Sequence, residues 1–355
     1  MDILKRIDNN EWQNLVNLYD IDISFSPNYF KIWEDCGDGK AHVVLYESCM
    51  GMVLYPFLIR KIDTVSKNGK YFDISTPYGY GGPLILNCKN INNEELTKNF
   101  RRKLNDYLYK IGVISEFIRF HPIIENHSLF LNSNEIEVQK NNSVIFVDLS
   151  LSEEEIWKNY KANNRKNIKK AIRNDIEVII DYDFEYIDEF LKIYYSTMSR
   201  NNAKKYYYFP KSFFRLIQLF KNNFVLFVSK IKDKIISVEI AFYDRNIIYS
   251  FLGGSIPEYF SIRPNNILKH KLILWAKGKK IRYFLLGGGY SYCDGIFKYK
   301  NSFSKDGIKD FFIGKKIHNY EIYNLLVREW KQKNNINNAL DDYDLNYFPL
   351  YRYKI

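Results

Sequence analysis

The sequence predicts an α+β fold made of two domains. At 355 residues the chain is longer than one hydrophobic core usually spans. Three strand-like segments follow one another within 224–252, separated only by the turns 232–234 and 244–246. A helix beginning at Pro264 and one further strand, 281–286, come next. Consecutive antiparallel strands followed by a crossover helix and another strand indicate mixed sheets flanked by helices, and not a doubly wound parallel sheet.

The first domain is expected over residues 1–148. Its long helix, 93–111, carries apolar residues every three to four positions, as an amphipathic helix requires. A short helix at 10–19 precedes it, and runs of β-branched and aromatic residues predict strands on both sides. The expected strands are 42–47, 52–60, 71–75, 116–120 and 144–149.

The second domain is expected over residues 149–355. It starts with a capping box, in which Ser152 is the N-cap and Glu155 stands three residues later. A helix is therefore predicted from there to about residue 172. The elements expected after it are a strand at 176–180, helices at 184–199 and 210–222, strands at 224–231, 235–243 and 247–252, the helix from Pro264 and the strand 281–286.

The chain is strongly basic, with 52 Lys and Arg against 41 Asp and Glu and a formal net charge of +11. This charge favours polyanionic partners such as RNA, phosphorylated sugars or anionic membrane surfaces, although lysine-rich solvated faces are an equally common cause. No run reaches the ~18 apolar residues of a spanning helix, and the polar start 1–12 lacks an apolar signal core. We therefore expect a cytoplasmic protein with no transmembrane segment, working at the inner face of the membrane if its substrate is envelope material.

The sequence contains no pattern typical of a metal site, a nucleotide-binding loop or a hydrolase nucleophile elbow. The five histidines form no H-x-x-x-H pair, and the acidic residues have no calcium-loop spacing. The motifs G-x-S-x-G, Walker A and G-x-G-x-x-G are all missing. The four cysteines have no C-x-x-C spacing, so free thiols are expected. We expect no bound metal and no resident cofactor.

Two of the expected strands end in glycine, at Gly253–Gly254 and at Gly287–Gly288–Gly289, with the Pro264 helix between them. This arrangement resembles the GNAT acyltransferase fold, in which two neighbouring parallel strands diverge and their exposed backbone holds the acyl donor. The alternative is that the glycines only turn the chain. The loop ahead of the helix, 261–266, lacks the glycines of a GNAT pyrophosphate loop, and Pro264 has no N–H to donate. A standard coenzyme A cradle is therefore not expected.

The chain as a whole resembles the FemA/FemB/FemX group of peptidoglycan-bridge aminoacyltransferases. The resemblance covers most of residues 40–310 and rests on the order and spacing of short motifs. These are Tyr78-Gly-Tyr-Gly-Gly-Pro83, Arg119-Phe-His-Pro122, Asn164 to Ala171, Tyr195 to Arg200, Pro264 to Leu268, Leu286-Gly-Gly288 and Gly295 to Lys300. The resemblance implies two tandem GNAT-like domains, an aminoacyl-tRNA donor and an amine acceptor on a peptidoglycan precursor. The long helical arm of some members has no counterpart here, because only residues 201–210 separate the two helices.

The resemblance also implies roles for individual residues. Lys300 matches the family lysine that neutralises charge near the transferred ester, and Arg200 matches the arginine that binds acceptor phosphates. A lysine beside the reacting carbonyl would stabilise the developing oxyanion, and an arginine can hold phosphate through two hydrogen bonds. A solvated lysine and an arginine paired with a local carboxylate are the alternatives. The other residues expected to bind substrate are Tyr78, Tyr80, Tyr207, Gly287 and Gly288.

A basic stripe is expected on the helix that follows Ser152. Its members recur at the spacing of one helix face and could follow the phosphates of an RNA backbone, although an ordinary solvated face would have the same pattern. They are Arg165, Lys166, Lys169, Lys170 and Arg173. Glu239 and Asp294 are candidate proton acceptors for an attacking amine, and no spacing argument chooses between them.

Together these observations predict a transferase that moves an aminoacyl group from aminoacyl-tRNA to an amine of a cell-wall or envelope precursor. The amine would attack the ester directly, without a covalent enzyme intermediate. An acyl-CoA-dependent GNAT N-acyltransferase acting on an amino sugar of a surface polysaccharide is the enzymatic alternative. A GNAT-like module that binds RNA or a precursor without catalysis is the non-enzymatic one.

Overall fold

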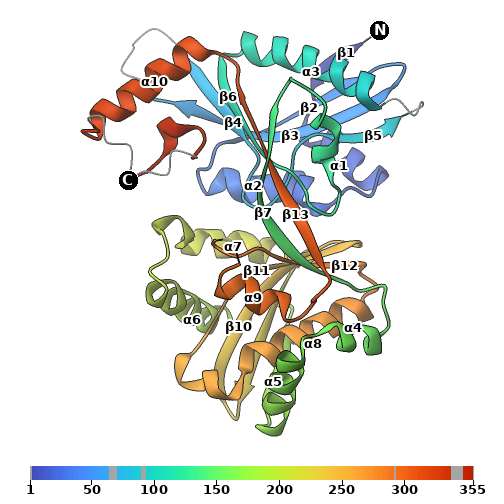
Figure 1. The fold of residues 1–355 in the computed structure, drawn as a ribbon, viewed down its shortest axis with the longest axis vertical. Coiled ribbons are helices and arrows are strands. Elements are labelled where there is room, and N and C mark those ends of the chain that lie inside the picture. Colours follow the sequence, from blue (N-terminus) through green and yellow to red (C-terminus); the bar gives the residue numbers. More distant parts are fainter. Residues whose placement is uncertain (1, 64–69, 89–92, 292, 337–346, 355) are drawn as a thin grey trace. The chain divides into compact units, whose positions relative to one another are not determined.

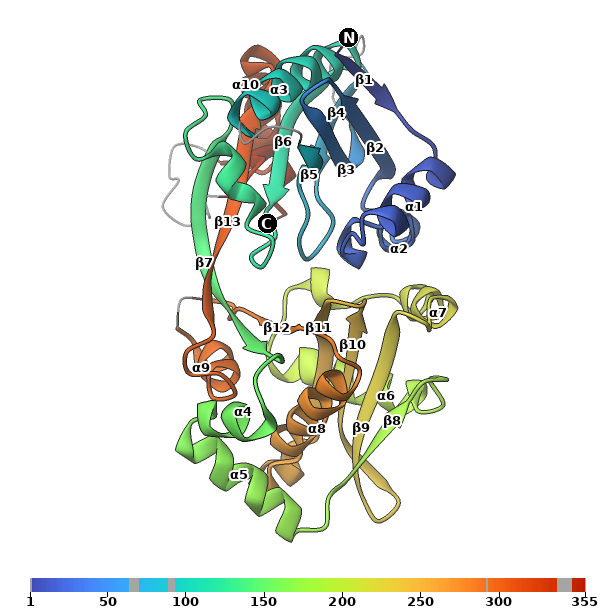
Figure 2. The ribbon, with the colours of Figure 1, turned by 90° about the vertical axis from the view of Figure 1, so that its right-hand side faces the viewer.

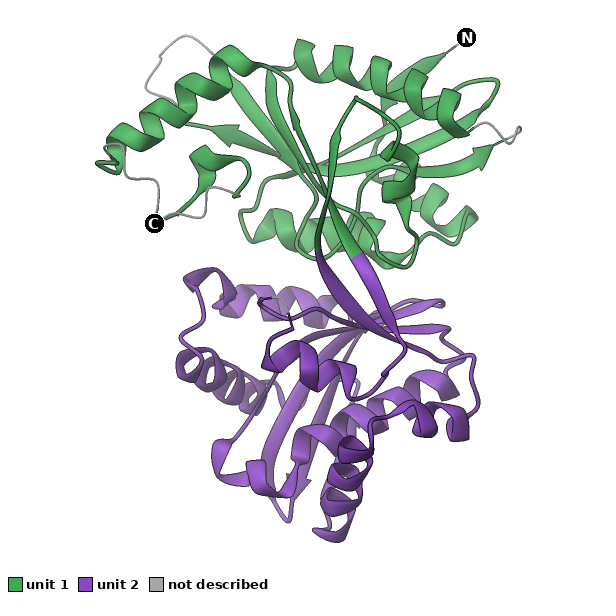
Figure 3. Cartoon of the chain, viewed as in Figure 1, with its two compact units in different colours: residues 1–141, 311–355 green, residues 142–310 purple. Residues whose placement is uncertain are grey.

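The computed structural model describes residues 2–63, 70–88, 93–291, 293–336 and 347–354. The chain forms two compact units, which Figure 3 draws in different colours: unit 1 is 1–141 together with 311–355, and unit 2 is 142–310. The sequence predicted a single boundary at residue 148. The structure differs, because residues 311–355 return to unit 1, so that unit 2 is inserted within it. The chain crosses between the units inside two long strands, β7 (Glu137–Asp148) and β13 (Ile308–Ile317).

Unit 1 is built on a mixed sheet with helices on both faces (Figure 1). Neighbouring strands are antiparallel except β4 and β6, which are parallel. Figure 2 shows α1 and α2 on one face of this sheet and α3 on the other. In spatial order the strands are β1 (Ile3–Arg6), β2 (Lys40–Glu47), β3 (Gly51–Ile62), β4 (Tyr71–Ser75), β6 (Val113–Arg119) and β13, with β5 (Leu84–Cys88) on β3. The helices are α1 (Asn9–Leu18), α2 (Pro27–Asp35), α3 (Asn93–Lys110) and α10 (Tyr320–Lys333).

The predicted apolar face of α3 forms the core of unit 1. Leu96, Phe100, Leu104 and Leu108 are completely buried against side chains of β2, β3 and β6. These four residues lie four positions apart, so they share one side of the helix. The amphipathic pattern was therefore a correct guide to both the helix and the face that it buries.

The C-terminal segment is bound to unit 1 through a buried carboxylate. Asp73 of β4 is fully buried, and its Oδ1 accepts from Arg60 Nε at 2.5 Å. Its Oδ2 accepts from Arg352 Nε at 2.8 Å and from the Tyr351 hydroxyl at 3.1 Å. In addition β13 pairs antiparallel with β6. These contacts join residues far apart in the sequence, which is why a boundary read from local patterns assigned this segment to the wrong unit.

A second buried carboxylate, Glu116 of β6, joins three elements of unit 1. Arg101 of α3 binds it through two parallel hydrogen bonds of 2.9 and 2.8 Å, and both side chains are fully buried. The Tyr55 hydroxyl donates to the same carboxylate at 2.9 Å, and His318 Nε2 lies 3.1 Å from it. Burial alone would raise the pKa of Glu116, but the Arg101 charge and these hydrogen bonds outweigh it and lower that pKa far below its usual range.

The strands of unit 2 are also mixed in direction. Its strands lie in the order β7, β12 (Tyr283–Gly287), β11 (Ile247–Ser255), β10 (Lys234–Tyr243), β9 (Phe224–Ile231) and β8 (Glu177–Asp181). Only β11 and β12 are parallel. In Figure 2, α6 and α7 lie on one face and α5 and α8 on the other. The helices are α4 (Glu153–Asn159), α5 (Ala162–Arg173), α6 (Ile187–Arg200), α7 (Lys211–Leu219), α8 (Pro264–Gly278) and α9 (Gly295–Asn301). The predicted α+β fold is confirmed in both units.

The single helix predicted after Ser152 is in fact two helices. The capping box is confirmed, because Ser152 and Glu155 exchange both hydrogen bonds at the start of α4. The chain then becomes extended at Tyr160 and Lys161 before α5 begins. Tyr160 is buried against Trp157, at a ring distance of 5.5 Å, and this packing takes the place of a further helical turn.

The Glu116 pair allows a test of how unit 1 is stabilised. We expect Glu116→Gln to destabilise unit 1 by about 3–5 kcal/mol, because it leaves the buried Arg101 charge without its counter-ion. Urea unfolding followed by tryptophan fluorescence measures this. Because the folded-state pKa of Glu116 is lowered, its contribution is complete above pH ~4.3 and is lost as the pH falls further. The variant should therefore lose less stability than the unaltered protein below pH 4.

The control is Glu47→Gln, which removes an exposed partner of Lys5 at 3.2 Å in the same unit. An exposed pair of this kind contributes less than ~1 kcal/mol. Equal losses in the two variants would show that the buried pair is no more important than a surface one.

Candidate active site

The site in unit 2 begins where two parallel strands part. β11 and β12 pair only from Ile247–Tyr283 to Tyr249–Leu285. Immediately afterwards β11 bulges against β10, with Phe251 as the extra residue between Ser250 and Leu252. A β-bulge bends its strand and increases the local twist, so β11 turns away from β12 at this point. The expectation that the two glycine-ended strands are parallel neighbours is confirmed.

The glycines at these strand ends are needed by the packing of the protein itself. A Cβ on Gly254 would lie 2.4 Å from Thr197 Oγ1 and 3.0 Å from the Ile193 carbonyl oxygen, both on α6. A Cβ on Gly288 would lie 2.9 Å from the Ser143 carbonyl oxygen. Gly287 adopts φ +76°, which side chains disfavour. Close approach of α6 and β7 therefore requires glycine here, whatever these residues bind.

Lys300 lies on α9 and points to the end of β12. Its Nζ donates to the Gly288 carbonyl oxygen at 2.7 Å, and its side chain is half-buried. Burial lowers the pKa of Lys300 to about 8, and the nearby charge of Lys269 adds to this effect, while Glu239 and Asp294 oppose it. At neutral pH the ammonium form still dominates. The sequence placed Lys300 in a closing segment after β12, and the structure shows a two-turn helix there.

A buried ion pair lies beside the parting strands. Lys269 of α8 and Glu239 of β10 are hydrogen-bonded, and both are almost completely buried. Ser250, the first β11 residue beyond the ladder with β12, accepts from Lys269 Nζ at 2.7 Å and donates to Glu239 Oε1 at 2.7 Å. Burial lowers the pKa of Lys269, and Glu239 partly offsets this. The ammonium also lies 5.4 Å from the centre of the Phe284 ring on β12.

Helices α8 and α9 meet at this place. The Tyr299 hydroxyl donates to the Asn265 carbonyl oxygen at 3.0 Å. Asn265 and Lys269 are four residues apart on α8, so they lie on one face of it. Tyr299 and Lys300 of α9 thus approach the face of α8 that carries the buried ion pair. The result is a half-buried ammonium group next to a main-chain carbonyl, where a carbonyl of a ligand could be polarised.

The start of α8 is held by asparagines from two of the sequence motifs. Asn266 Nδ2 donates to Asn164 Oδ1 of α5 at 2.8 Å, and Asn164 Nδ2 donates to the Ser302 carbonyl oxygen, just after α9, at 3.2 Å. The structure thus brings together three segments that carry the family resemblance. Ahead of α8, Arg263 takes a left-handed conformation, and no side chain caps the helix.

Asp294 has a structural role in this region. Its carboxylate accepts from the backbone N–H groups of Tyr290 at 2.6 Å, Ser291 at 2.9 Å and Phe297 at 2.8 Å, and so caps α9. Burial acts to raise the pKa of Asp294, but these backbone bonds outweigh it and lower that pKa. Both candidate proton acceptors are therefore engaged, Asp294 as a helix cap and Glu239 in the ion pair.

Arg200 and Tyr207 lie around the C-terminal end of α6. Arg200 is exposed, and its Nη1 donates to the carbonyl oxygen of Ser255, the last residue of β11, at 3.3 Å. Its guanidinium also lies 5.1 Å from the centre of the Phe260 ring. The Tyr207 carbonyl oxygen accepts from the Tyr194 hydroxyl at 2.5 Å. Arg200 therefore sits at the far end of the strand that carries Ser250, while its role toward phosphate stays a prediction.

Tyr78 and Tyr80 belong to unit 1. The Tyr78 carbonyl oxygen accepts from the Tyr29 hydroxyl at 2.7 Å, and the Tyr80 ring lies 5.4 Å from that of His121. Asn126 fixes the loop by donating to the carbonyl oxygens of Gly81 and Pro83, at 2.9 and 3.0 Å. The loop is therefore shaped by contacts within unit 1.

The basic stripe on α5 is only partly available to a ligand. Lys166, Lys169, Lys170 and Arg173 are exposed, as an RNA-binding face requires. Arg165 is different, because its Nη1 donates to the carbonyl oxygens of Tyr160 and, at 3.2 Å, of Lys158. It thereby satisfies carbonyl groups at the end of α4.

Sequence reasoning did not identify Lys269 or Ser250 as residues of the site, although the sequence contains a signal for Lys269. Lys269 interrupts the apolar face of α8 between Leu268 and Leu272, and Glu239 lies on β10 between the buried apolar residues Val238 and Ile240. Two opposite charges, each at a position that its element buries, are best satisfied by each other.

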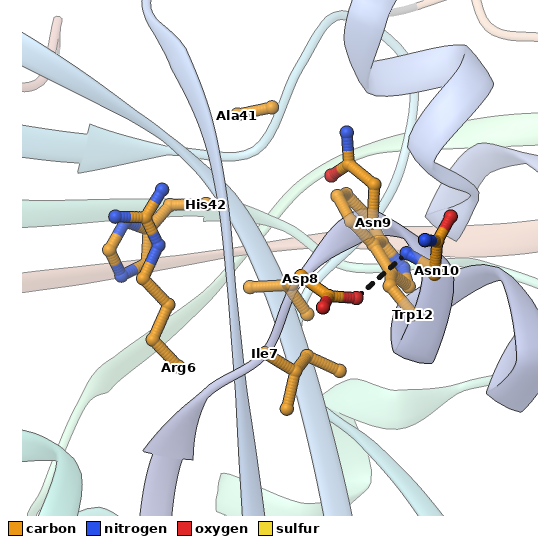
Figure 4. Close-up of a pocket in the computed structure, with 9 residues that line it drawn as sticks. Arg6, Ile7, Asp8, Asn9, Asn10, Trp12, Ala41 and His42 are labelled. Carbon is orange, nitrogen blue, oxygen red and sulfur yellow. Dashed lines mark hydrogen bonds between the residues drawn. The ribbon is translucent and has the colours of Figure 1, made fainter.

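A hollow in unit 1 has a volume of about 580 Å³ and lies between α1 and β2 (Figure 4). Two of its polar side chains, those of Asp8 and His42, are already hydrogen-bonded. Asp8 accepts from Asn10 N at 2.9 Å, and His42 Nε2 lies 2.6 Å from the Tyr107 hydroxyl. Burial and the charge of Arg6 lower the pKa of His42 to about 4, so it is neutral at pH 7. We assign no function to this hollow.

Comparison with known proteins agrees with the geometry of unit 2. Residues 158–301 match the model of the Acetyltransferase (GNAT) domain family. A crystal structure of FemX has a TM-score of 0.70 and 12% identity, with 91% of this chain and 99% of that one covered. The chain has the fold of FemX. The predicted resemblance to the FemAB-like GNAT group is confirmed at this level.

Two further structures share the fold. The C-terminal domain of a candidate lysylphosphatidylglycerol synthetase from Agrobacterium fabrum has a TM-score of 0.54 and 12% identity, covering 90% of this chain and 96% of that one. A tandem GNAT protein from the clavulanic acid pathway has a TM-score of 0.50 and 6% identity, covering 90% and 99%. The predicted pair of tandem GNAT-like domains is thus confirmed. A comparison of the sequence with curated proteins found no match.

The described residues were searched for metal-binding groups and for membrane-spanning helices. No group of three or more His, Cys, Asp or Glu side chains among them could hold a metal ion. None of the helices within these residues is long and apolar enough to cross a membrane.

The environment of Lys300 can be tested without knowing the substrate. Acetic anhydride reacts with neutral amines, so we expect the acetylation rate of Lys300, followed by mass spectrometry, to level off near pH 8. An ordinary lysine continues to gain reactivity toward pH ~10. Lys298, exposed on the same helix, is the reference for reagent access. A rate for Lys300 that rises like that of an ordinary lysine would contradict the described environment.

Removing one or the other member of the buried ion pair should shift the pKa of Lys300 in opposite directions. Lys269→Met removes a neighbouring positive charge, so the midpoint for Lys300 should move upward. Glu239→Gln removes a negative charge and should move it downward. Circular dichroism checks that both variants are folded. Midpoints that stay in place in both would mean that the pair does not act on Lys300.

Proposed function

We propose that this protein is an aminoacyltransferase that moves an aminoacyl group from aminoacyl-tRNA to an amine of a cell-wall or envelope precursor. The observation that carries the proposal is the half-buried Lys300 ammonium, held on the Gly288 carbonyl oxygen where β11 and β12 part. A GNAT-like fold and a structural likeness to FemX support the same class of reaction.

The proposed transfer requires only that the amine and the ester be held together and that a positive charge lie near the ester carbonyl. The acceptor amine attacks the ester carbonyl, its lone pair forms the new C–N bond, and the carbonyl oxygen becomes an oxyanion. Lys300 stabilises that oxyanion by hydrogen bonding and by charge. The oxyanion then collapses, the ester C–O bond breaks, and the tRNA ribose hydroxyl leaves with a proton.

The attacking amine must lose a proton during this sequence. Asp294 caps α9, and Glu239 is paired with Lys269. We therefore assign proton removal to water and to the leaving ribose oxygen, and not to a carboxylate of the site. No metal or resident cofactor takes part in the proposed reaction.

Two features favour an aminoacyl-tRNA donor. The start of α8 offers Pro264 without an N–H and Arg263 in a left-handed turn, which suits a pyrophosphate cradle poorly. The exposed residues Lys166, Lys169 and Lys170 of α5 supply charge that could follow tRNA phosphates. Because aminoacyl-tRNA is a cytoplasmic substrate, we propose that the reaction takes place in the cytoplasm.

An acyl-CoA-dependent N-acyltransferase acting on an amino sugar of a surface polysaccharide is the second candidate. It is favoured by one observation, the match of residues 158–301 to the Acetyltransferase (GNAT) domain family. The first experiment separates the donors: calorimetry with acetyl-CoA and longer acyl-CoAs, beside transfer assays with a mixture of labelled aminoacyl-tRNAs and amine-bearing envelope precursors. Micromolar acyl-CoA binding would favour the second candidate over our proposal.

Variants of Lys300 test the role of the ammonium. With a donor in hand, we expect Lys300→Ala to lower turnover by about 10²–10³-fold and to change donor binding only a few-fold. Lys298→Ala, on the exposed side of the same helix, should be unaffected. Retained binding with no turnover from any donor in the unaltered protein would instead indicate a non-catalytic binding module.

A further inference from the structure

One long segment of unit 2 carries no acidic residue. Residues 190–232 contain no Asp or Glu, whereas about five would be expected at the average content of the chain. The same segment carries nine Lys and Arg. It comprises most of α6, the connection 201–210, α7 and β9. The positive charge of the protein is therefore locally unopposed in this part of the sequence.

Several of these cations also lack an acidic partner in space. Lys221 pairs with Asp183 at 2.7 Å, and Lys230 with Glu177 at 3.3 Å. Within the part of the chain that the structure describes, Lys205, Lys211 and Arg215 are exposed and have no carboxylate partner. Three cations thus remain uncompensated in and next to α7.

Large apolar and aromatic side chains are exposed among the same cations. Leu219 is 75% exposed, Tyr206 49% and Tyr208 38%. On α7, Lys211, Arg215 and Leu219 recur every four residues and form one solvent-facing stripe, while the opposite side is buried in the core. We call Lys205, Tyr206, Tyr208, Lys211, Arg215 and Leu219 the α7 surface.

The connection before α7 is held in place by hydrogen bonds. The Tyr195 hydroxyl donates to the Phe209 carbonyl oxygen at 2.6 Å, and the Tyr195 ring stacks on that of Tyr208 at 6.5 Å. The Tyr194 hydroxyl holds the Tyr207 carbonyl oxygen. The exposed tyrosines are therefore presented on a fixed backbone and need little ordering when they bind.

We propose that the α7 surface docks the protein on an anionic membrane surface. Lysine and arginine are attracted by acidic phospholipid headgroups, and tyrosine and leucine side chains partition into the interface beneath them. A nucleic acid would be attracted by the same charges, but it offers no apolar layer for Leu219.

The test is co-sedimentation of the full-length protein with sucrose-loaded vesicles. We expect binding to vesicles of phosphatidylglycerol and phosphatidylcholine, and at least tenfold weaker binding to phosphatidylcholine alone. The triple variant Lys205→Glu, Lys211→Glu, Arg215→Glu should lose at least tenfold in binding. The matched control Lys166→Glu, Lys169→Glu, Lys170→Glu on α5 changes the net charge equally and should stay within about threefold.

A second variant removes apolar contact without changing charge. Tyr206→Ser with Leu219→Ser should weaken vesicle binding several-fold. Equal losses in the two charge-reversed triples would overturn the proposal, because net charge alone would then explain binding. No binding of the unaltered protein to anionic vesicles would also overturn it. Loss of tRNA binding with unchanged vesicle binding in the α7 triple would identify an RNA face instead. None of these outcomes depends on the proposed transfer reaction.

Discussion

The parting of β11 from β12 is the constraint on which unit 2 depends. Beyond Tyr249 and Leu285 the two strands no longer pair, and the bulge at Phe251 turns β11 away. The neighbouring elements are arranged around this divergence. α6 packs directly on the backbone of Gly254, and Lys300 of α9 binds the carbonyl oxygen that follows β12. The site therefore arises from an interruption of the sheet, and no loop inserted from elsewhere is needed to form it.

The buried ion pair of unit 1 joins structural elements, whereas that of unit 2 lies beside the candidate site. In unit 1 Glu116 gathers Arg101, Tyr55 and His318 and ties strands to a helix and to the C-terminal segment. In unit 2 the pair of Lys269 and Glu239 includes a serine hydroxyl at the edge of the candidate site. In both units, burying the two charges of the pair costs desolvation free energy. In unit 2 a second, half-buried lysine, Lys300, lies close enough for the pair to alter its titration.

Local patterns in the sequence were a reliable guide to the elements and a poor guide to their long-range partners. The α3 face, the capping box at Ser152, three consecutive strands and the helix from Pro264 all follow from periodicity and capping chemistry. The break at Tyr160, whose ring packs on His270 and Phe303, depends on contacts with distant segments. The same holds for the helix around Lys300 and for the return of residues 311–355. For the site, the glycine-ended strands and Lys300 were found from the sequence, whereas Lys269 and Ser250 required knowing that α8 crosses β10 and β11.

The insertion of unit 2 between the two parts of unit 1 determines the order in which the two units can be completed during synthesis. Unit 2 is one uninterrupted segment, complete once residue 310 has been made. Unit 1 has its first part translated earlier, yet Asp73 must wait for Arg352, which follows it by 279 residues. Domains fold as units when all of their sequence is present. The inserted unit can therefore be finished on the ribosome while the unit that begins the chain is still incomplete.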